Sequence, residues 1–257
     1  CRSHRRFITI MIRAILFDLD DTLLGNNMVT FLPRYFELCG QFAARYMPPE
    51  EFMQKLLTAS RTMVKNVDPA VTNEEAFWTS FEELADQDTS IIAAEFDSFY
   101  FNDFEQLRSI TDPVPDAAGL IEWCFEQDLH VVIATNPMFP RRAVEARLAW
   151  AGIPVTDYDY ALVTTMENMH ATKPNAAYYN EILDRVGSLP NEALMVGDDC
   201  KNDIIPAGAL GLFSYWIQLP GVDLPPDVRP TAQGSLAELR ERFEQGWLHE
   251  LGTAVAE

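Results

Sequence analysis

Five short apolar runs constrain the fold of this chain more than any other feature of its sequence. None of them alternates apolar with polar residues, and continuous runs of this kind are typical of strands covered on both faces of a parallel sheet. The runs cover residues 12–17, 131–134, 160–163, 193–196 and 212–217. Helical patterns lie between or after the later runs, over residues 116–127, 139–151, 174–186 and 235–245. This alternation predicts an α/β fold, a doubly wound parallel sheet with helices on both faces.

A long interval separates the first apolar run from the second, and it shows no clear strand pattern. It contains amphipathic helical patterns with Pro-containing breaks between them. These patterns cover residues 31–46, 49–65, 73–85 and 89–110. We therefore expect a smaller α-helical domain, residues 28–110, inserted into an α/β core made of residues 11–27 and 111–257. Residues 1–10 are expected to be a peripheral extension, with Met11 as the functional start.

The charge balance restricts the partners of the chain. Its formal net charge is −20, which argues against non-specific binding to nucleic acid or to an anionic membrane. No apolar stretch approaches the roughly 20 residues that span a bilayer, and the N-terminal apolar run is interrupted by Arg13. We expect a cytoplasmic protein without nucleic-acid or membrane partners, and the sequence leaves its oligomeric state open. An anionic substrate has to be attracted by local groups, such as a metal ion, a Lys or backbone N–H groups.

Two carboxylates follow the first predicted strand, at Asp18 and Asp20. Side chains two residues apart in an extended chain point the same way, so these two share a face. They repel each other unless a cation joins them or one of them is protonated. One carboxylate can then attack phosphorus while the other donates a proton to the leaving group. The alternative is an acidic turn after a strand.

Small polar residues and a Lys follow the next two predicted strands. Thr135 and Asn136 end the second strand, where a hydroxyl and neighbouring backbone N–H groups can hold a phosphoryl oxygen; they can also be plain turn formers. Lys173 precedes a predicted helix, and there it can neutralise a phosphate or relieve the carboxylate repulsion. The alternative for Lys173 is a solvated surface side chain.

A third acidic group follows the fourth predicted strand. Gly197 permits a tight turn, Asp198 lies at the carboxyl end of the strand, and Asp203 opens the next helix. Carboxylate oxygens are ligands that Mg²⁺ prefers, although Asp203 could instead complement the helix dipole. Because the carboxyl ends of parallel strands form the ligand-binding edge of such sheets, we expect all these groups to meet there.

Four motifs in this order make the sequence resemble the haloacid dehalogenase-like (HAD) superfamily. They are residues 18–23, Thr135-Asn136, Lys173-Pro174, and Gly197-Asp198 with Asp203. The resemblance covers residues 11–27 and 113–220 and implies a Rossmann-like core. The insertion resembles the helical cap that the family carries after its first motif, so the resemblance also implies a cap over the site.

The resemblance implies a role for each of these residues. Asp18 would be the nucleophile that forms an aspartyl-phosphate, and Asp20 would protonate the leaving oxygen and then activate water. The remaining roles are phosphate binding by Thr135, Asn136 and Lys173, and binding of Mg²⁺ by Asp18, the backbone carbonyl of Asp20, Asp198 and Asp203.

The function expected from this set is a Mg²⁺-dependent phosphohydrolase that cleaves a small-molecule phosphate monoester. Dehalogenases of the superfamily usually lack an acid/base Asp at the position of Asp20, which favours phosphate esters. A phosphomutase needs the same residues and stays open as an alternative, as does, with less support, a non-catalytic scaffold on this fold. Most aromatic residues of the insertion are expected in its core, and Arg34, Arg61 and Lys65 on solvated helix faces.

Overall fold

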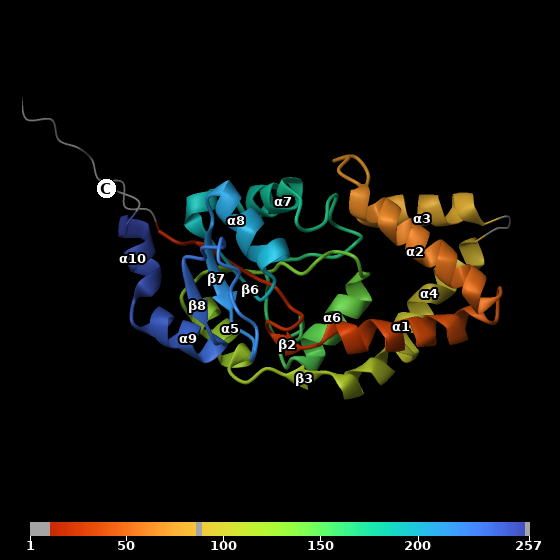
Figure 1. Cartoon of the computed structure of the whole chain (residues 1–257), viewed down its shortest axis with the longest axis horizontal. Helices are drawn as coiled ribbons and strands as arrows, with labels where there is room; N and C mark the ends of the chain where they lie inside the picture. The colour runs from red at the N-terminus through yellow and green to blue at the C-terminus, as the bar shows by residue number, and fades with distance from the viewer. Residues whose placement is uncertain (1–10, 86–88, 255–257) are drawn as a thin grey trace, which may run out of the picture.

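The computed structural model describes residues 11–85 and 89–254. The expected peripheral extension, residues 1–10, lies outside the described residues. Figure 1 shows an α/β core at one end of an elongated molecule and a group of helices at the other. Within the described ranges, no helix has both the length and the apolar character needed to cross a membrane.

The core is built on one six-stranded sheet in the order β5-β4-β1-β6-β7-β8. Every pair of neighbouring strands is parallel, which confirms the predicted doubly wound α/β fold. The strands are β1 (Ala14–Phe17), β4 (His130–Ile133), β5 (Leu162–Val163), β6 (Ala193–Gly197), β7 (Phe213–Ile217) and β8 (Ala232–Gly234). The sequence analysis missed β8, because its residues Ala-Gln-Gly carry no apolar run.

Alternate residues of β1 pack into different hydrophobic clusters on the two faces of the sheet. Ile15 and Phe17 of β1 pack in the core that also contains Leu120 of α5, whereas Leu16 packs with Ile182 of α7 on the other face. The core helices are α5 (Ala117–Glu126), α6 (Arg141–Trp150), α7 (Ala176–Val186), α8 (Ile205–Leu210), α9 (Leu236–Glu244) and α10 (Trp247–Ala254). The helix α10 was not predicted.

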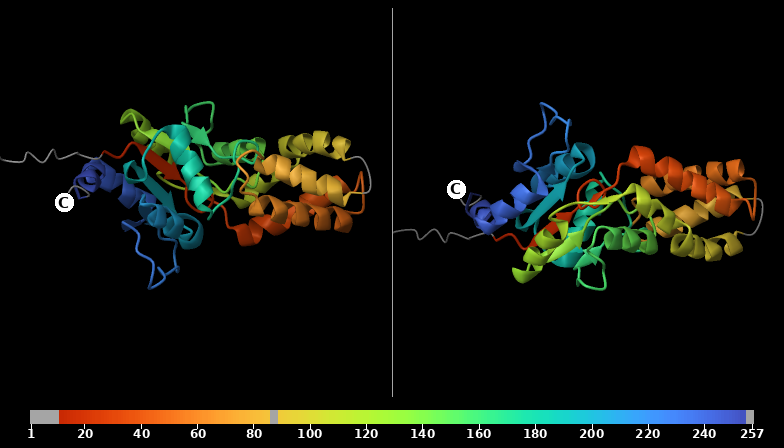
Figure 2. Two further views of the ribbon diagram at one scale, coloured as in Figure 1. Left: turned by 90° about the horizontal axis from the view of Figure 1, so that it is seen from above. Right: turned by 90° about the horizontal axis from the view of Figure 1, so that it is seen from below.

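The interval after β1 folds into a group of helices, which we call the helical unit. It contains α1 (Met28–Ala43), α2 (Pro49–Lys65), α3 (Asn73–Leu84), α4 (Ser90–Asn102) and a 3₁₀ helix (Phe104–Ile110). Local signals start these helices: the Asn27 side chain accepts from the Val29 N–H, and Thr72 forms a capping box with Glu75. The views in Figure 2 place this unit beyond the sheet, on the side away from α9 and α10.

One helix was predicted over residues 89–110, and that prediction was wrong. The α4 helix ends at Asn102 and a 3₁₀ helix follows. Phe104 is fully buried and stacks on Trp150 of α6, with ring centroids 5.3 Å apart. The Trp150 indole N–H also donates to the Glu105 carboxylate at 2.9 Å. These tertiary contacts join the helical unit to the core and are not visible in a helical periodicity.

A two-stranded ribbon holds the two chain crossings between the core and the helical unit. Its strands β2 (Leu24–Gly25) and β3 (Asp112–Pro113) pair antiparallel. The interval was predicted to contain no strand, so this ribbon is a correction. Strands of two residues are too short to produce a detectable pattern.

Candidate active site

Three strands of the sheet deliver polar residues to one edge. Asp18 follows β1, and its backbone N–H donates to the Val196 carbonyl of β6 at 2.9 Å. Asp198 follows β6, and its carbonyl accepts the Trp216 indole N–H at 2.7 Å. Thr135 follows β4 and is buried. Since the chain runs outward from β1 through β4 to β5 and then returns to β6, this edge contains the switch point at which such sheets bind ligands.

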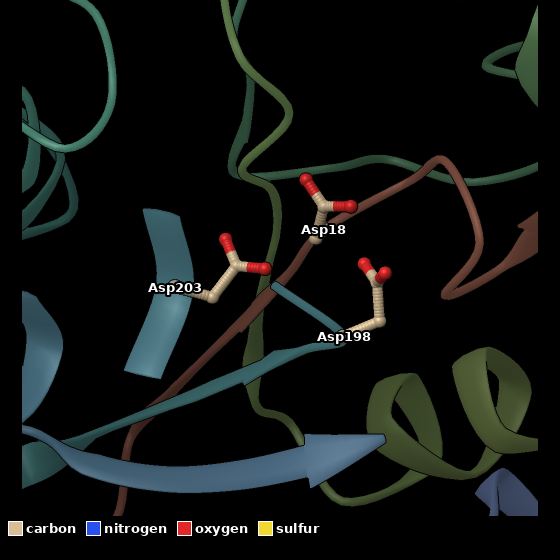
Figure 3. Close-up of side chains that lie close together, drawn as sticks. All are labelled: Asp18, Asp198 and Asp203. Carbon is tan, nitrogen blue, oxygen red and sulfur yellow. The ribbon is translucent and has the colours of Figure 1, made fainter. Parts of the chain in front are cut away.

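Three carboxylates meet at this edge (Figure 3). One oxygen each of Asp18, Asp198 and Asp203 lies within 4.8 Å of the other two. Asp203 comes from a helical turn, Cys200–Ile204, which begins where the Asp199 side chain accepts from the Lys201 and Asn202 N–H groups. The Asp203 carboxylate in turn accepts the Asp199 N–H at 3.1 Å. These bonds fix Asp203 facing Asp18 rather than solvent, in contrast to the helix-dipole alternative.

The absence of a side chain at Gly197 allows this close approach. A Cβ atom built at Gly197 would lie 2.8 Å from the Asp203 Cβ and closer still to its carboxylate. No L-residue with a Cβ fits there without displacing Asp203. The Gly therefore serves the packing of the carboxylate cluster in addition to the turn that the sequence predicted.

Lys173 lies at the centre of the site. Its ammonium group donates to Asp18 Oδ1 at 2.7 Å and to Asp203 Oδ1 at 2.6 Å, and the Lys side chain is 1% exposed. It is therefore not a solvated surface side chain. The helix that was predicted to begin at Pro174 begins at Ala176, because the Asn175 side chain caps it by accepting from the Ala177 N–H.

The electrostatics of the cluster favour a further positive charge. Burial raises the pKa of Asp18 well above its ordinary value, although Lys173 opposes this shift. Burial, and next the charge of Asp203, raise the pKa of Asp198 to about 7. Burial would lower the pKa of Lys173, but Asp18 and Asp203 raise it well above its usual range. Three carboxylates thus face one permanently charged ammonium group, and their excess negative charge suits a divalent cation.

Asp20 lies outside this cluster and has partners that the sequence analysis missed. Its carboxylate forms a hydrogen-bonded ion pair with Arg147 of α6 and accepts the Asn26 side-chain N–H at 2.7 Å. The Arg147 guanidinium is fully buried, with its carbon atom 4.7 Å from the centroid of the Phe139 ring. The sequence did contain a signal for Arg147. It is a charged residue on the face of α6 that otherwise carries buried apolar residues such as Leu148, and a buried charge requires a partner.

Thr135 and Asn136 lie beside Lys173. The Thr135 carbonyl accepts the hydroxyl groups of Thr164 at 2.7 Å and Tyr178 at 2.9 Å, which fixes the loop after β4. The Asn136 side-chain oxygen accepts the Lys173 backbone N–H at 3.3 Å. Asn136 therefore already has a structural role in holding the Lys segment.

A cavity of about 600 Å³ contains the whole set. All seven residues predicted for the site line it: Asp18, Asp20, Thr135, Asn136, Lys173, Asp198 and Asp203. Residues of α1, α2, α3 and α4 line the opposite side. The volume falls in the range typical of small-molecule sites, about 300–1,000 Å³.

Comparison with known proteins identifies the family. A model of the haloacid dehalogenase-like hydrolase family matches residues 12–211. The chain belongs to this family, with helices inserted after the first motif, which confirms the resemblance seen in the sequence.

The chain also resembles individual members of the family. It is 29% identical over 206 residues to a ribulose-1,5-bisphosphate 5-phosphatase of Halopiger xanaduensis, a match that covers 79% of this chain and 83% of that protein. The structure of 2-haloacid dehalogenase from Pseudomonas syringae pv. Tomato DC3000 matches with a TM-score of 0.62 and 21% identity, over 91% of this chain and 99% of the other. The structure of a HAD phosphatase from Thermococcus onnurineus matches with a TM-score of 0.56 and 21% identity, over 91% of this chain and 98% of the other. The two structural matches show the fold.

Proposed function

We propose that the chain is a Mg²⁺-dependent phosphatase that cleaves small-molecule phosphate monoesters through an aspartyl-phosphate on Asp18. The observation that carries the proposal is the buried Lys173 ammonium between Asp18 and Asp203, with Asp198 beside them, at the bottom of a cavity. Membership of the hydrolase family and the similarity to a named phosphatase support the same class of reaction.

The donor atoms at this edge fit Mg²⁺. Carboxylate oxygens and backbone carbonyls are hard ligands, and the cluster has more negative charge than Lys173 balances. Asp18, Asp198 and the backbone carbonyl of Asp20 would hold the ion, with Asp203 in support. When bound, Mg²⁺ neutralises phosphoryl oxygens and orients the phosphate for in-line attack.

The chain's own residues then perform two displacements. A carboxylate oxygen of Asp18 attacks phosphorus, the bond from phosphorus to the leaving oxygen breaks, and Asp20 gives its proton to that oxygen. Asp20 next takes a proton from a water molecule that attacks the aspartyl-phosphate, which releases phosphate and restores Asp18. In the resting structure both Asp20 oxygens accept hydrogen bonds, from Arg147 and from Asn26. Asp20 must therefore release Arg147 and take up a proton before the first step.

The remaining predicted residues bind the phosphoryl group. Lys173 reaches Asp18 and can contact the oxygens of a phosphoryl group on it, while Thr135 and Asn136 line the same end of the cavity. Residues 28–110 would act as a separate cap domain that covers the site and excludes water, on a core of residues 11–27 and 111–257.

Hydrolysis of para-nitrophenyl phosphate tests the proposal, with Mg²⁺, with a chelator, and with Asp18→Asn. The matched control is Asp184→Asn, the same substitution at an exposed position of α7. Turnover should require both Mg²⁺ and Asp18 and survive in the control. Full Mg²⁺-dependent turnover by Asp18→Asn would refute the mechanism, and faster phosphoryl transfer to an added sugar phosphate than to water would favour a phosphomutase.

A further inference from the structure

The part of the cavity that faces the carboxylate edge is mainly apolar. Its wall is formed by side chains of the helical unit and of the loop after β4, where a leaving group would lie. Prominent among them are Leu32, Phe36, Leu57, Phe77, Trp78 and Phe139. The aromatic residues of the helical unit were expected mostly in its core, with a few facing the substrate. Most of them are buried in the core, and Phe36, Phe77 and Trp78 also line the cavity.

Three hydroxyl groups in this wall are already bonded within the protein. The hydroxyl groups of Tyr35 and Tyr100 hydrogen-bond to each other at 2.7 Å. The Ser60 hydroxyl donates to the Leu56 carbonyl at 2.8 Å. A substrate with several hydroxyl groups would find these three hydroxyl groups already engaged, and each of its own buried polar groups left unpaired would be unfavourable.

The charges that line the wall are negative. Glu74 and Asp97 belong to α3 and α4. Glu167 lies next to Glu74, because the Glu74 N–H donates to the Met166 carbonyl at 2.8 Å, and the Glu167 carboxylate accepts the Arg141 backbone N–H. Burial raises the pKa of Glu74, and the charges of Glu167 and Asp97 raise it further, which shows that these acidic groups repel one another.

A second phosphate would find no cation in this wall. Among the described residues that line the cavity, Lys173 is the one basic side chain, and Asp18 and Asp203 occupy it. None of the basic side chains of the helical unit lines the cavity: Arg34, Arg45, Lys55, Arg61, Lys65 and Arg108. Arg34 pairs with Glu37 at 2.5 Å instead.

We infer that the substrate is the monophosphate ester of a largely apolar alcohol that carries no further negative charge, and that a second phosphate group is rejected. This inference rests on the proposed phosphatase function and specifies its substrate class. It separates this chain from the Halopiger xanaduensis relative, whose name specifies a bisphosphate.

The test compares three substrates that share a primary alcohol as leaving group: n-hexyl phosphate, glucose 6-phosphate and the bisphosphate of 1,6-hexanediol. The shared leaving group makes kcat/KM report recognition rather than intrinsic reactivity. We expect kcat/KM for n-hexyl phosphate to exceed kcat/KM for each of the other two substrates at least about tenfold, since buried methylene groups favour binding. Equal or better turnover of glucose 6-phosphate or of the bisphosphate, still dependent on Mg²⁺ and Asp18, would overturn the inference and leave the proposed function intact. No turnover of any phosphate ester would overturn both.

A charge reversal provides a second, independent readout. Glu74→Lys places a cation in the wall. It should lower the ratio of kcat/KM for n-hexyl phosphate to kcat/KM for the bisphosphate by about tenfold. Glu83→Lys makes the same change of charge on the same helix at an exposed position that does not line the cavity. It should leave the preference unchanged. An equal shift in both variants would show an effect of overall charge and would contradict the role of the wall.

Discussion

Replacing either partner of the ion pair between Asp20 and Arg147 should destabilise the protein to very different extents. The Arg147 side chain is 1% exposed and that of Asp20 is 18% exposed. Asp20→Asn therefore leaves a buried guanidinium without a counter-charge, whereas Arg147→Met leaves a carboxylate that water and Asn26 can still solvate. One guanidinium nitrogen of Arg147, Nη2, is already buried and has no hydrogen-bond partner among the residues that the structure describes, which adds to the cost of losing Asp20.

The magnitudes follow from this asymmetry. Removing one partner of a buried pair costs about 3–5 kcal/mol, and we expect Asp20→Asn at the lower end of that range because its own side chain is partly solvated. Met fills most of the Arg volume, so Arg147→Met should cost about 1 kcal/mol. For a chain of this size each kcal/mol lowers Tm by roughly 2–4 °C. The expected shifts are then roughly 6–12 °C for Asp20→Asn and a few degrees for Arg147→Met.

The assay is thermal unfolding of both single variants, the double variant and the parent chain, all in chelator so that metal binding does not contribute. In the double variant the buried charge and its partner are both gone, so its loss of stability should be smaller than the sum of the two single losses by at least about 1.5 kcal/mol. Additive losses within about 0.5 kcal/mol, or an Asp20→Asn variant no less stable than Arg147→Met, would refute the reasoning.

Three further perturbations address the carboxylate cluster. Gly197→Ala should displace Asp203 and lower turnover roughly 10- to 100-fold with the fold intact by circular dichroism; unchanged turnover would contradict the close packing. Lys173→Met leaves Asp18 and Asp203 buried without a cation, so turnover should fall more than about 100-fold and Tm in chelator should drop, with Mg²⁺ restoring part of it. Because the pKa of Asp198 is raised from 3.8 to about 7, the metal-free protein loses stability through this group as the pH rises between those values, and Mg²⁺ should bind more weakly at about pH 6 than at about pH 8. Equal Mg²⁺ affinities at the two pH values, measured by calorimetry, would contradict the raised pKa of Asp198.

Much of the fold and the site could be predicted because it depends on signals close together in the sequence. The apolar runs of β1, β4 and β6 and the polar residues directly after them already define one edge of a parallel sheet. Each of Asp18, Thr135 and Asp198 is therefore placed by its distance from the end of a strand. Lys173 lies in the long loop between β5 and α7, over residues 164–175, so its contacts with both Asp18 and Asp203 do not follow from the strand ends alone.

The features that escaped prediction depend on contacts between distant residues or on very short elements. Arg147 reaches Asp20 across 127 positions of the chain, and no local pattern records which buried polar group on α6 meets which strand end. The break between α4 and the 3₁₀ helix depends on the contact of Phe104 with Trp150. The strands β2, β3 and β8 are too short for an alternation of apolar and polar residues to be recognised, which takes about four residues or more.

The β2–β3 ribbon has a consequence for how proteins built like this one can diverge. It holds the two ends of the helical unit side by side, so for the sheet the whole insertion is equivalent to a surface loop. The entropy of closing a loop rises only slowly with its length, so a change in the length of residues 26–111 would cost the core little closure entropy. A single contiguous stretch of the gene can be exchanged or lengthened by recombination, provided that the new insertion restores contacts such as those of Phe104 with Trp150 and of Asn26 with Asp20. Evolution can in this way replace the surface that meets the alcohol while it keeps the groups that meet the phosphate.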